Sequence, residues 1–431
     1  MTTRQTAGWA ERSEPHRCCP KLRDQWGSLR STHSAVMFAA VVLLVSAVLA
    51  LAPNATAQDT PATPLPTSDP LVRVRLRDAA DQETTVDGRL LVRAKDGGLL
   101  VEARSGRLWT VTPDRLVEET AVEGKLFSPL TKEELGEHLI EELREAGNKS
   151  DFLIHTTDHY VVCTDTSQAY AEWCGGLLER LHKAFGVFWT ARNMEVREPE
   201  FPLPVVILKT QTEFAELAAF DRTPGSAKGA GYFLITGNRI VLYDLTATEQ
   251  QTPAKTVSDV FRRVQSVPGS VATVVHEATH QIAFNSGLHT RYADNPIWMT
   301  EGMAMYFETP DLKSQRGWQT IGRLNRHRKS QFLDFVAKRR KADSLESLIG
   351  SDARFREPDT QLDAYGEAWA LSYFLIRTKP RQYSAWLKLI AEKPPLQFDS
   401  PEERLSLFLS EFGDDLPGLD KQMLAWIRRQ R

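Results

Sequence analysis

The segment that most limits what this chain can fold into is residues 270–287, SVATVVHEATHQIAFNSG. Two histidines within it, His276 and His280, are four residues apart. Four residues of an α-helix turn the chain by about 400°, so both imidazoles lie on one helical face. Ser270 is a suitable N-cap and Gly287 a suitable stop. The segment therefore predicts a bounded helix that carries two imidazoles side by side.

The same helix carries an apolar face and one carboxylate. Two imidazoles one turn apart can bind one metal ion. Glu277 is rotated by about 100° from His276, so it is poorly placed as a ligand but can reach a water on the open side of the metal. The alternative is that both histidines are ordinary residues of an amphipathic helix. A separate stripe is expected to pack into the core: Val271, Val275, Ala278 and Ile282.

A second segment, residues 294–308 (DNPIWMTEGMAMYFE), contains a candidate third ligand, Glu301. Asn295 is a suitable N-cap and Pro296 a suitable first helical residue. We therefore expect a helix that begins here, carries Glu301 in its second turn and ends before Pro310.

The spacing between the two segments allows their side chains to meet. Twenty residues lie between His280 and Glu301, enough for a loop and a returning helix that brings the carboxylate to the imidazoles. Gly302 and Ala304 remove bulk, so we expect the second helix to approach the first closely there. Glu308 is the reserve candidate for a ligand or for a group that supports one. The alternative is a solvated Glu301, which its apolar neighbours argue against: Ile297, Trp298, Met299, Met303 and Met305.

This ligand set suits zinc, with one ion expected per chain. A zinc ion held by two histidines and a glutamate keeps a fourth position for water, whose pKa falls from about 15.7 toward 7. Glu277 is then the expected general base, which takes a proton from the water and returns it to the leaving amine.

The two motifs together resemble the gluzincin clan of zinc metallopeptidases, which includes thermolysin-like and aminopeptidase-like enzymes. The chain is most similar to an uncharacterised bacterial family of secreted proteins with HEATHQ and TEGxA motifs. This similarity covers about residues 150–431 and is strongest at 270–308 and 361–376. It implies that His276, His280 and Glu301 bind zinc. Glu277 is the base in that comparison.

The resemblance also suggests a donor and a substrate-binding strand. A tyrosine downstream of the third ligand stabilises the oxyanion in aminopeptidase-like relatives, which implies Tyr365 here; the alternative is that Tyr365 only packs one turn from Trp369. Residues 229–244 resemble in position the edge strand that covers the catalytic helix, where an extended peptide could pair; the alternative is an interior hairpin. The chain departs from relatives at Thr300, where many have asparagine, and at Met305, where thermolysin-like enzymes have aspartate.

The amino-terminal region predicts export. An uncharged apolar run, Ala35–Ala52, follows a positive flank, and Ala55 and Ala57 fit a cleavage site before Gln58. Residues 1–57 are therefore a predicted signal peptide, although an uncleaved membrane anchor is the alternative. Met37 lies inside this run and is an alternative start.

The remaining pattern predicts an α+β fold with a zincin-like catalytic domain. Residues 58–70 are a proline-rich linker, and residues 71–125 read as a small β-meander whose role is open. Residues 126–310 form the expected catalytic domain of sheet and helices, and residues 311–431 a helical carboxy-terminal domain. The expected elements of the catalytic domain are helices at 131–145, 168–189 and 212–220 and strands at 152–155, 160–163, 204–208, 232–235 and 240–243.

Composition argues against nucleic acid as a partner. The net charge of −3 gives no excess of basic residues that would bind a phosphate backbone.

Some cysteine, histidine and basic residues have open roles. Cys163 and Cys174 would remain after signal removal, as a disulfide or as two buried thiols. His155 and His159 read as ordinary residues near the sheet. Residues 316–341 contain nine basic residues and one acidic residue, which predicts a solvated basic face or, alternatively, contact with an anionic surface.

The sequence thus predicts an exported, periplasmic or extracellular zinc metallopeptidase, which would act on a peptide or protein. Two alternatives are a non-catalytic cell-envelope binding protein that retains the fold, and a zinc amidase that cuts a cell-wall linkage. Retention of Glu277 favours an active enzyme. Substrate, cleavage specificity and oligomeric state stay open.

Overall fold

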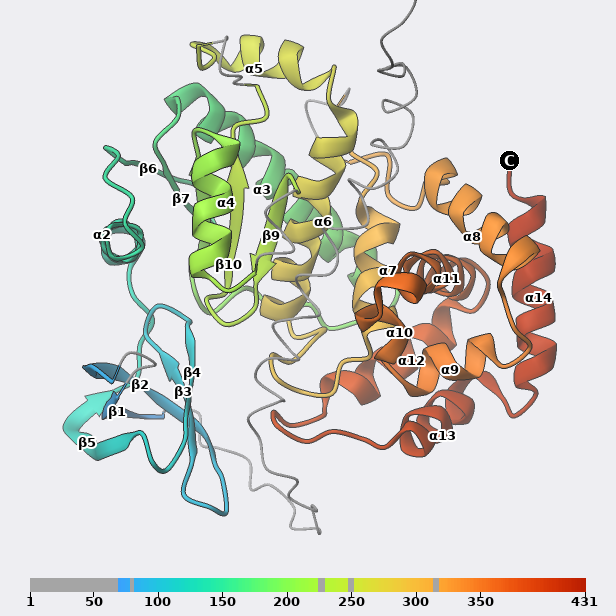
Figure 1. Ribbon diagram of the computed structural model, residues 1–431, viewed down its shortest axis with the longest axis horizontal. Helices are drawn as coiled ribbons and strands as arrows, with labels where there is room; N and C mark the ends of the chain where they lie inside the picture. The colour runs from blue at the N-terminus through green and yellow to red at the C-terminus, as the bar shows by residue number, and fades with distance from the viewer. Residues whose placement is uncertain (1–68, 78–80, 224–228, 247–251, 313–317) are drawn as a thin grey trace, which may run out of the picture.

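The computed structural model describes residues 69–77, 81–223, 229–246, 252–312 and 318–431. The predicted signal peptide or anchor, residues 1–57, lies outside them, as does the linker up to residue 68. Within the described part, none of the helices combines the length and apolar character needed to cross a bilayer. The predicted α+β class is confirmed, with two sheets followed by helices (Figure 1).

The first sheet is antiparallel and has the strand order β4-β3-β2-β1-β5. Four successive strands form the predicted meander, and β5 returns to pair with β1. Gly97 and Gly106 lie in the predicted turns with φ values of 93° and 81°, which glycine adopts without a Cβ penalty. The strands are β1 (Pro70–Arg77), β2 (Glu83–Arg93), β3 (Leu99–Ala103), β4 (Leu108–Val111) and β5 (Leu116–Leu126).

The second sheet is mixed and has the order β6-β7-β8-β10-β9. Its central strands β7, β8 and β10 are parallel, and both outer strands are antiparallel to their neighbours. The predicted strands at these positions are confirmed to within a residue or two. They are β6 (Leu153–Thr156), β7 (Tyr160–Thr164), β8 (Leu203–Leu208), β9 (Gly231–Leu234) and β10 (Arg239–Tyr243).

Helices cover both faces of this second sheet. On β8, Val205 and Ile207 pack with α3 and α6, whereas Val206 and Leu208 pack with α2 and α4. Because both faces are buried, the strand reads as a continuous apolar run instead of an alternating one. The covering helices are α2 (Lys132–Glu145), α3 (Gln168–Thr190), α4 (Gln211–Phe220) and α6 (Pro268–Asn285).

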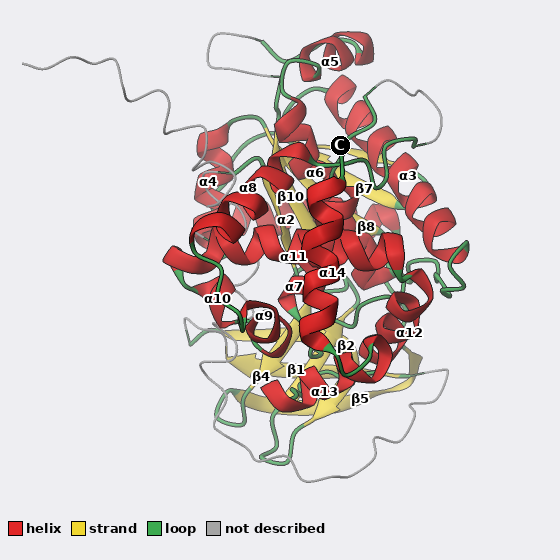
Figure 2. Cartoon of the chain, turned by 90° about the vertical axis from the view of Figure 1, so that its right-hand side faces the viewer, coloured by secondary structure: helices red, strands yellow, loops and turns green. Residues whose placement is uncertain are grey.

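The carboxy-terminal half is helical, as predicted. Helix α6 lies between the second sheet and these helices (Figure 1), and several of them lie in front of both sheets when the molecule is turned (Figure 2). The helices outside the sheet layers are α5 (Val257–Val264), α7 (Ile297–Phe307), α8 (Arg326–Lys338), α9 (Ser344–Gly350), α10 (Ala353–Arg356), α11 (Pro358–Thr378), α12 (Pro380–Ala391), α13 (Pro401–Phe412) and α14 (Leu416–Arg429).

The expected N-caps of the two motif helices were wrong. Helix α6 begins at Pro268, two residues before Ser270, because proline is well tolerated in the first helical turn. Helix α7 begins at Ile297 with Pro296 at the cap position, so Asn295 does not cap it. The backbone nitrogen of Ile297 instead donates to Asp352 Oδ1 at 3.0 Å.

The close approach expected at Gly302 occurs against a different helix. A Cβ on Gly302 would lie 1.9 Å from Ser372 Oγ and 2.7 Å from the backbone oxygen of Ala368. Both neighbours belong to α11, whereas the sequence led us to expect α6. The missing side chain therefore lets α7 lie directly on the central helix of the carboxy-terminal half.

Cys163 and Cys174 are separate buried thiols. Of the two alternatives that the sequence left open, two buried thiols is therefore the correct one and a disulfide is not. Cys163 on β7 packs with α2 and α4, whereas Cys174 on α3 packs on the opposite face of the sheet. Burial raises the pKa of each thiol to about 12, so both stay protonated near neutrality.

Candidate metal centre

Three side chains from α6 and α7 converge on one point. His276 Nε2 lies 3.1 Å from both His280 Nε2 and Glu301 Oε2, and His280 Nε2 lies 3.5 Å from Glu301 Oε1. All three residues are buried. The structure thus brings together the three ligands that the sequence predicts.

The spacing of these atoms fits a metal ion. Zinc–ligand bonds of about 2.0–2.1 Å at tetrahedral angles place neighbouring ligand atoms about 3.3 Å apart. The contacts of 3.1, 3.1 and 3.5 Å bracket that value. In addition, Glu301 Oε1 is buried and, apart from the 3.5 Å contact with His280 Nε2, has no polar partner among the described residues. Two imidazoles and this carboxylate form a donor set suited to zinc.

The electrostatics of the group favour a cation. Burial alone would disfavour an imidazolium, but hydrogen bonds to Glu301 and Glu308 raise the pKa of His276 to about 10. Burial likewise opposes ionisation of Glu301, yet the charges and hydrogen bonds of His280 and His276 lower its pKa to about 2. Carboxylates that stabilise a buried imidazolium also stabilise a metal ion in its place.

Glu308, the reserve candidate, lies behind His276 and outside the ligand set. Glu308 Oε2 contacts His276 Nδ1 at 3.1 Å, so it orients the ring whose Nε2 faces Glu301. Asn325 Nδ2 and Arg328 Nε donate to Glu308 Oε1 at 2.6 and 3.0 Å. The pKa of Glu308 is lowered: burial opposes the shift, but the charge of Arg328 outweighs it. This carboxylate–histidine pair is the usual support of a metal-binding imidazole.

The basic segment at 316–341 is in part the solvated face that the sequence predicts, because most of its described basic residues are exposed: Arg323, Arg326, Lys338, Arg339 and Lys341. Arg328 is buried on Glu308. Arg339 pairs with Asp363 at 2.7 Å, and Arg340 pairs with Glu367 at 2.8 Å. The ion pairs of Arg328, Arg339 and Arg340 join residues far apart in the chain, and the local charge count did not predict them.

Glu277 is held beside the ligands by the edge strand. The backbone nitrogen of Phe233 donates to Glu277 Oε2 at 2.9 Å. Phe233 belongs to β9, which is the last strand of the second sheet, so the predicted position of an edge strand over the motif helix is confirmed. Burial raises the pKa of Glu277, opposed by the charges of His276 and His280. A carboxylate with a raised pKa is better matched to a proton acceptor near neutrality.

Tyr365 lies on α11 and is fully buried. Burial raises the pKa of its hydroxyl well above the ordinary value, and the charge of Glu301 raises it further. Its ring meets Phe355 edge-to-face with centroids 5.2 Å apart. The tertiary fold therefore brings a residue far downstream in the chain into the electrostatic field of Glu301.

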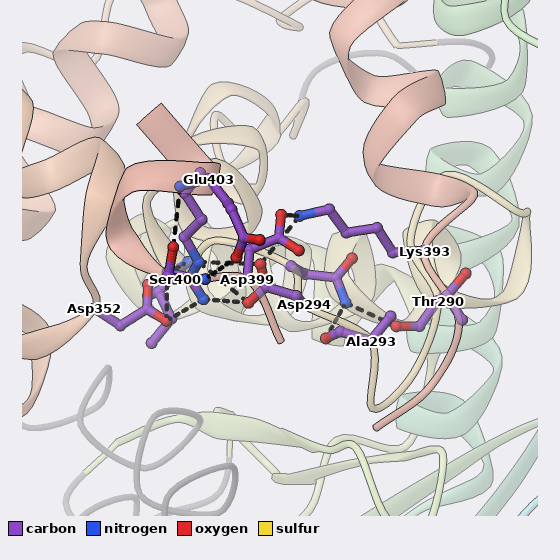
Figure 3. A network of polar contacts seen from close by, with 11 residues as sticks. Thr290, Ala293, Asp294, Asp352, Lys393, Asp399, Ser400 and Glu403 are labelled. Carbon is purple, nitrogen blue, oxygen red and sulfur yellow. Dashed lines mark hydrogen bonds and ion pairs between the residues drawn. The ribbon is translucent and has the colours of Figure 1, made fainter. Parts of the chain in front are cut away.

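A polar network fixes the segment that leads into α7 (Figure 3). Asp294 accepts from Arg404 of α13 and from Lys393 Nζ at 3.0 Å. Arg404 also contacts Asp352, which accepts from Ile297 at the start of α7. These contacts fix the start of α7 and therefore the position of Glu301, the third candidate ligand, on that helix.

Sequence reasoning missed several residues around the centre. Arg328 and Asn325 were read only as parts of a basic helix. His289 was overlooked: it is buried, has no hydrogen-bond partner among the described residues, and meets Phe284 edge-on at 5.2 Å. Burial lowers the pKa of His289 to about 3, and the charge of His280 acts in the same direction. Only its position nine residues after His280 could have drawn attention to it.

Comparison with known protein families gives a match over the two motif helices. A family described as a protein of unknown function (DUF1570) matches residues 270–397, a range that contains α7, α11 and all of α6 except its first two residues. This agrees with the expected similarity to an uncharacterised family, and it carries no activity. The comparison with curated proteins gave no match.

Proposed function

We propose that this protein is an exported zinc-dependent peptidase in which His276, His280 and Glu301 hold the metal. The observation that carries the proposal is the convergence of these three side chains beside a fourth buried group, Glu277, which is not part of the ligand set. A binding site alone needs the first three groups, whereas hydrolysis also needs a base.

In this proposal zinc, when bound, activates water and polarises the scissile carbonyl. Glu277 accepts a proton on its carboxylate and passes it to the leaving amine. Its contact with the backbone nitrogen of Phe233 holds the carboxylate in place. Tyr365 donates its hydroxyl proton in a hydrogen bond to the oxyanion that forms.

The outer edge of β9, which pairs with no further strand among the described residues, supports a peptide as substrate. Phe233 N donates to Glu277, so this part of the backbone faces away from β10. All four residues of β9 are buried, so the segments that cover this edge must move before a peptide can pair there. By strand alternation the backbone of Gly231 faces the same side. An extended peptide that pairs there would lie beside Glu277. Such pairing reads backbone groups and places few demands on the peptide sequence.

The test compares the zinc-loaded protein with Glu277→Gln on a peptide library, read by mass spectrometry. We expect the wild type to cleave, and the variant to keep its zinc and its melting temperature but lose turnover. Cleavage at the wild-type rate by Glu277→Gln would refute the assignment of the base.

One observation favours a second candidate, a non-catalytic metal-binding protein of the cell envelope. His276, Glu277, His280, Glu301 and Tyr365 are each at most 2% exposed, so a substrate must displace neighbouring segments to reach them. Zinc binding without cleavage of any peptide would support this candidate. Cleavage of amide-linked cell-wall fragments alone would instead support an amidase.

A further inference from the structure

A second cluster of histidine and glutamate side chains lies away from α6, around the start of β7. His159 occupies the turn between β6 and β7, His182 is on α3, and Glu198 precedes β8. Each can offer one ligand atom, and these atoms lie within 4.8 Å of one another. The sequence had suggested that His159 was an ordinary residue near the sheet.

The distances show how the cluster is arranged. His159 Nε2 lies 3.0 Å from Glu198 Oε2. The rings of His159 and His182 are stacked with centroids 4.0 Å apart. Glu198 is 82% exposed in its side chain, so its carboxylate can move to complete a coordination shell at little cost.

The other nitrogen of His159 is held by a buttressing carboxylate. His159 Nδ1 lies 2.7 Å from Glu179 Oε2. Glu179 Oε1 also accepts from Thr157 Oγ1 at 2.6 Å and from the backbone nitrogen of His159 at 2.7 Å. The ring is therefore fixed with Nε2 turned toward Glu198. A glutamate that orients a histidine in this way is typical of metal sites.

The carboxylate that holds the leading histidine is common to both centres, whereas the second histidine is placed differently: its ring is T-shaped to His276 at the first centre and stacked on His159 at the second. At the first centre, Glu308 holds His276 through Nδ1, while Nε2 faces a second histidine and a glutamate. At the second, Glu179 holds His159 through Nδ1, while Nε2 faces Glu198 with a second histidine stacked alongside.

We propose that His159, His182 and Glu198 form a second binding site for a divalent transition metal ion, with Glu179 as the buttress. Two imidazoles and a carboxylate suit zinc, nickel or copper(II), and disfavour calcium and magnesium, which prefer oxygen ligands. The ion would link the β6–β7 turn, α3 and the segment before β8. Its role would therefore be to stabilise the packing of these three segments. The proposal does not depend on the peptidase assignment.

Calorimetric titration of the metal-free protein with zinc chloride tests the site. The wild type should bind two ions per chain. His280→Ala should remove the ion at α6 and leave the second, whereas His182→Ala should remove the second and leave the first. The double variant should bind neither.

Two further variants keep the test decisive. Glu198→Gln removes a charge from an exposed side chain, so the variant should fold normally. Its affinity for the second ion should be lower by about 10-fold or more. His138→Ala removes a half-exposed imidazole that lies 3.7 Å from Glu142, outside the cluster, and should still bind two ions.

A wild type that binds a single ion, lost in His280→Ala, would overturn the proposal. The proposal would also be overturned if His138→Ala and Glu198→Gln lowered the affinity for the second ion equally. The second ion would then bind to scattered surface histidines.

Discussion

Replacing Glu308 with glutamine should weaken zinc binding although Glu308 is not a ligand. The glutamine keeps the shape but presents an NH2 group where one carboxylate oxygen stood. Glu308 accepts from donors on both oxygens, including His276 Nδ1 at 3.1 Å and Arg328 Nε at 3.0 Å. The NH2 group must therefore face at least one donor. The least costly relief is a tautomer shift that places the proton of His276 on Nε2, where it blocks the metal.

The size of the effect follows from these contacts. Loss of a carboxylate that orients a metal-binding histidine costs about 10- to 100-fold in affinity, or about 1.4 to 2.7 kcal/mol. Arg328 is only 4% exposed and loses its ionic partner. Breaking a buried ion pair costs up to about 3–5 kcal/mol of stability in the metal-free protein.

The assay is competition of the folded protein against a zinc indicator, together with urea denaturation of the metal-free form. Glu141→Gln, an exposed glutamate on α2, is the matched control and should change neither value. The double variant Glu308→Gln/Arg328→Met should regain part of the stability but none of the zinc affinity. Wild-type zinc affinity in a folded Glu308→Gln protein would refute this account of His276.

Three further predictions follow from other contacts. Tyr365→Phe should lower kcat by about 100- to 1000-fold on a verified peptide, with zinc content and melting temperature unchanged; wild-type kcat would assign Tyr365 to packing alone. Gly302→Ala should destabilise by about 1–3 kcal/mol in urea denaturation, because its Cβ would overlap Ser372 of α11; unchanged stability would contradict that approach. Burial opposes ionisation of Asp294, but its hydrogen bonds and ion pairs with Arg404 and Lys393 lower its pKa. Its contribution is therefore present above about pH 4 and lost as pH falls through the folded-state pKa. The free energy of unfolding of Asp294→Asn should therefore fall less steeply at acidic pH than that of the wild type. If the two proteins lose stability equally as the pH falls, this role of Asp294 is wrong.

Local patterns were sufficient for most of the secondary structure. The apolar strands of the second sheet, the turn chemistry of the first sheet and the helical spacing of His276 and His280 all act over a few residues. Such signals depend on backbone geometry and on side-chain periodicity, and both follow from the order of neighbouring residues in the sequence. The α+β class and the pairing of two imidazoles on α6 could therefore be predicted.

Contacts between distant elements could not be predicted in this way. The partner of Gly302 is Ser372, and the partner of Glu308 is Arg328, on helices that the sequence does not place. Sequence periodicity says that a helix has a buried face, but not which helix will cover it. The same reason explains why α7 begins where Asp352 accepts from its first residue and not at the expected cap.

The sequence by itself determined the chemical groups of the candidate centre and the helix that carries two of them. Only the tertiary structure decided that Glu308 supports His276 instead of binding metal. It also decided that His159, in the turn before β7, lies beside His182 and Glu198, which are candidate ligands of a second site. The physical reason is the range of the interactions: helix formation is governed by residues within one or two turns, whereas a coordination site needs atoms from separate elements placed within a few ångströms.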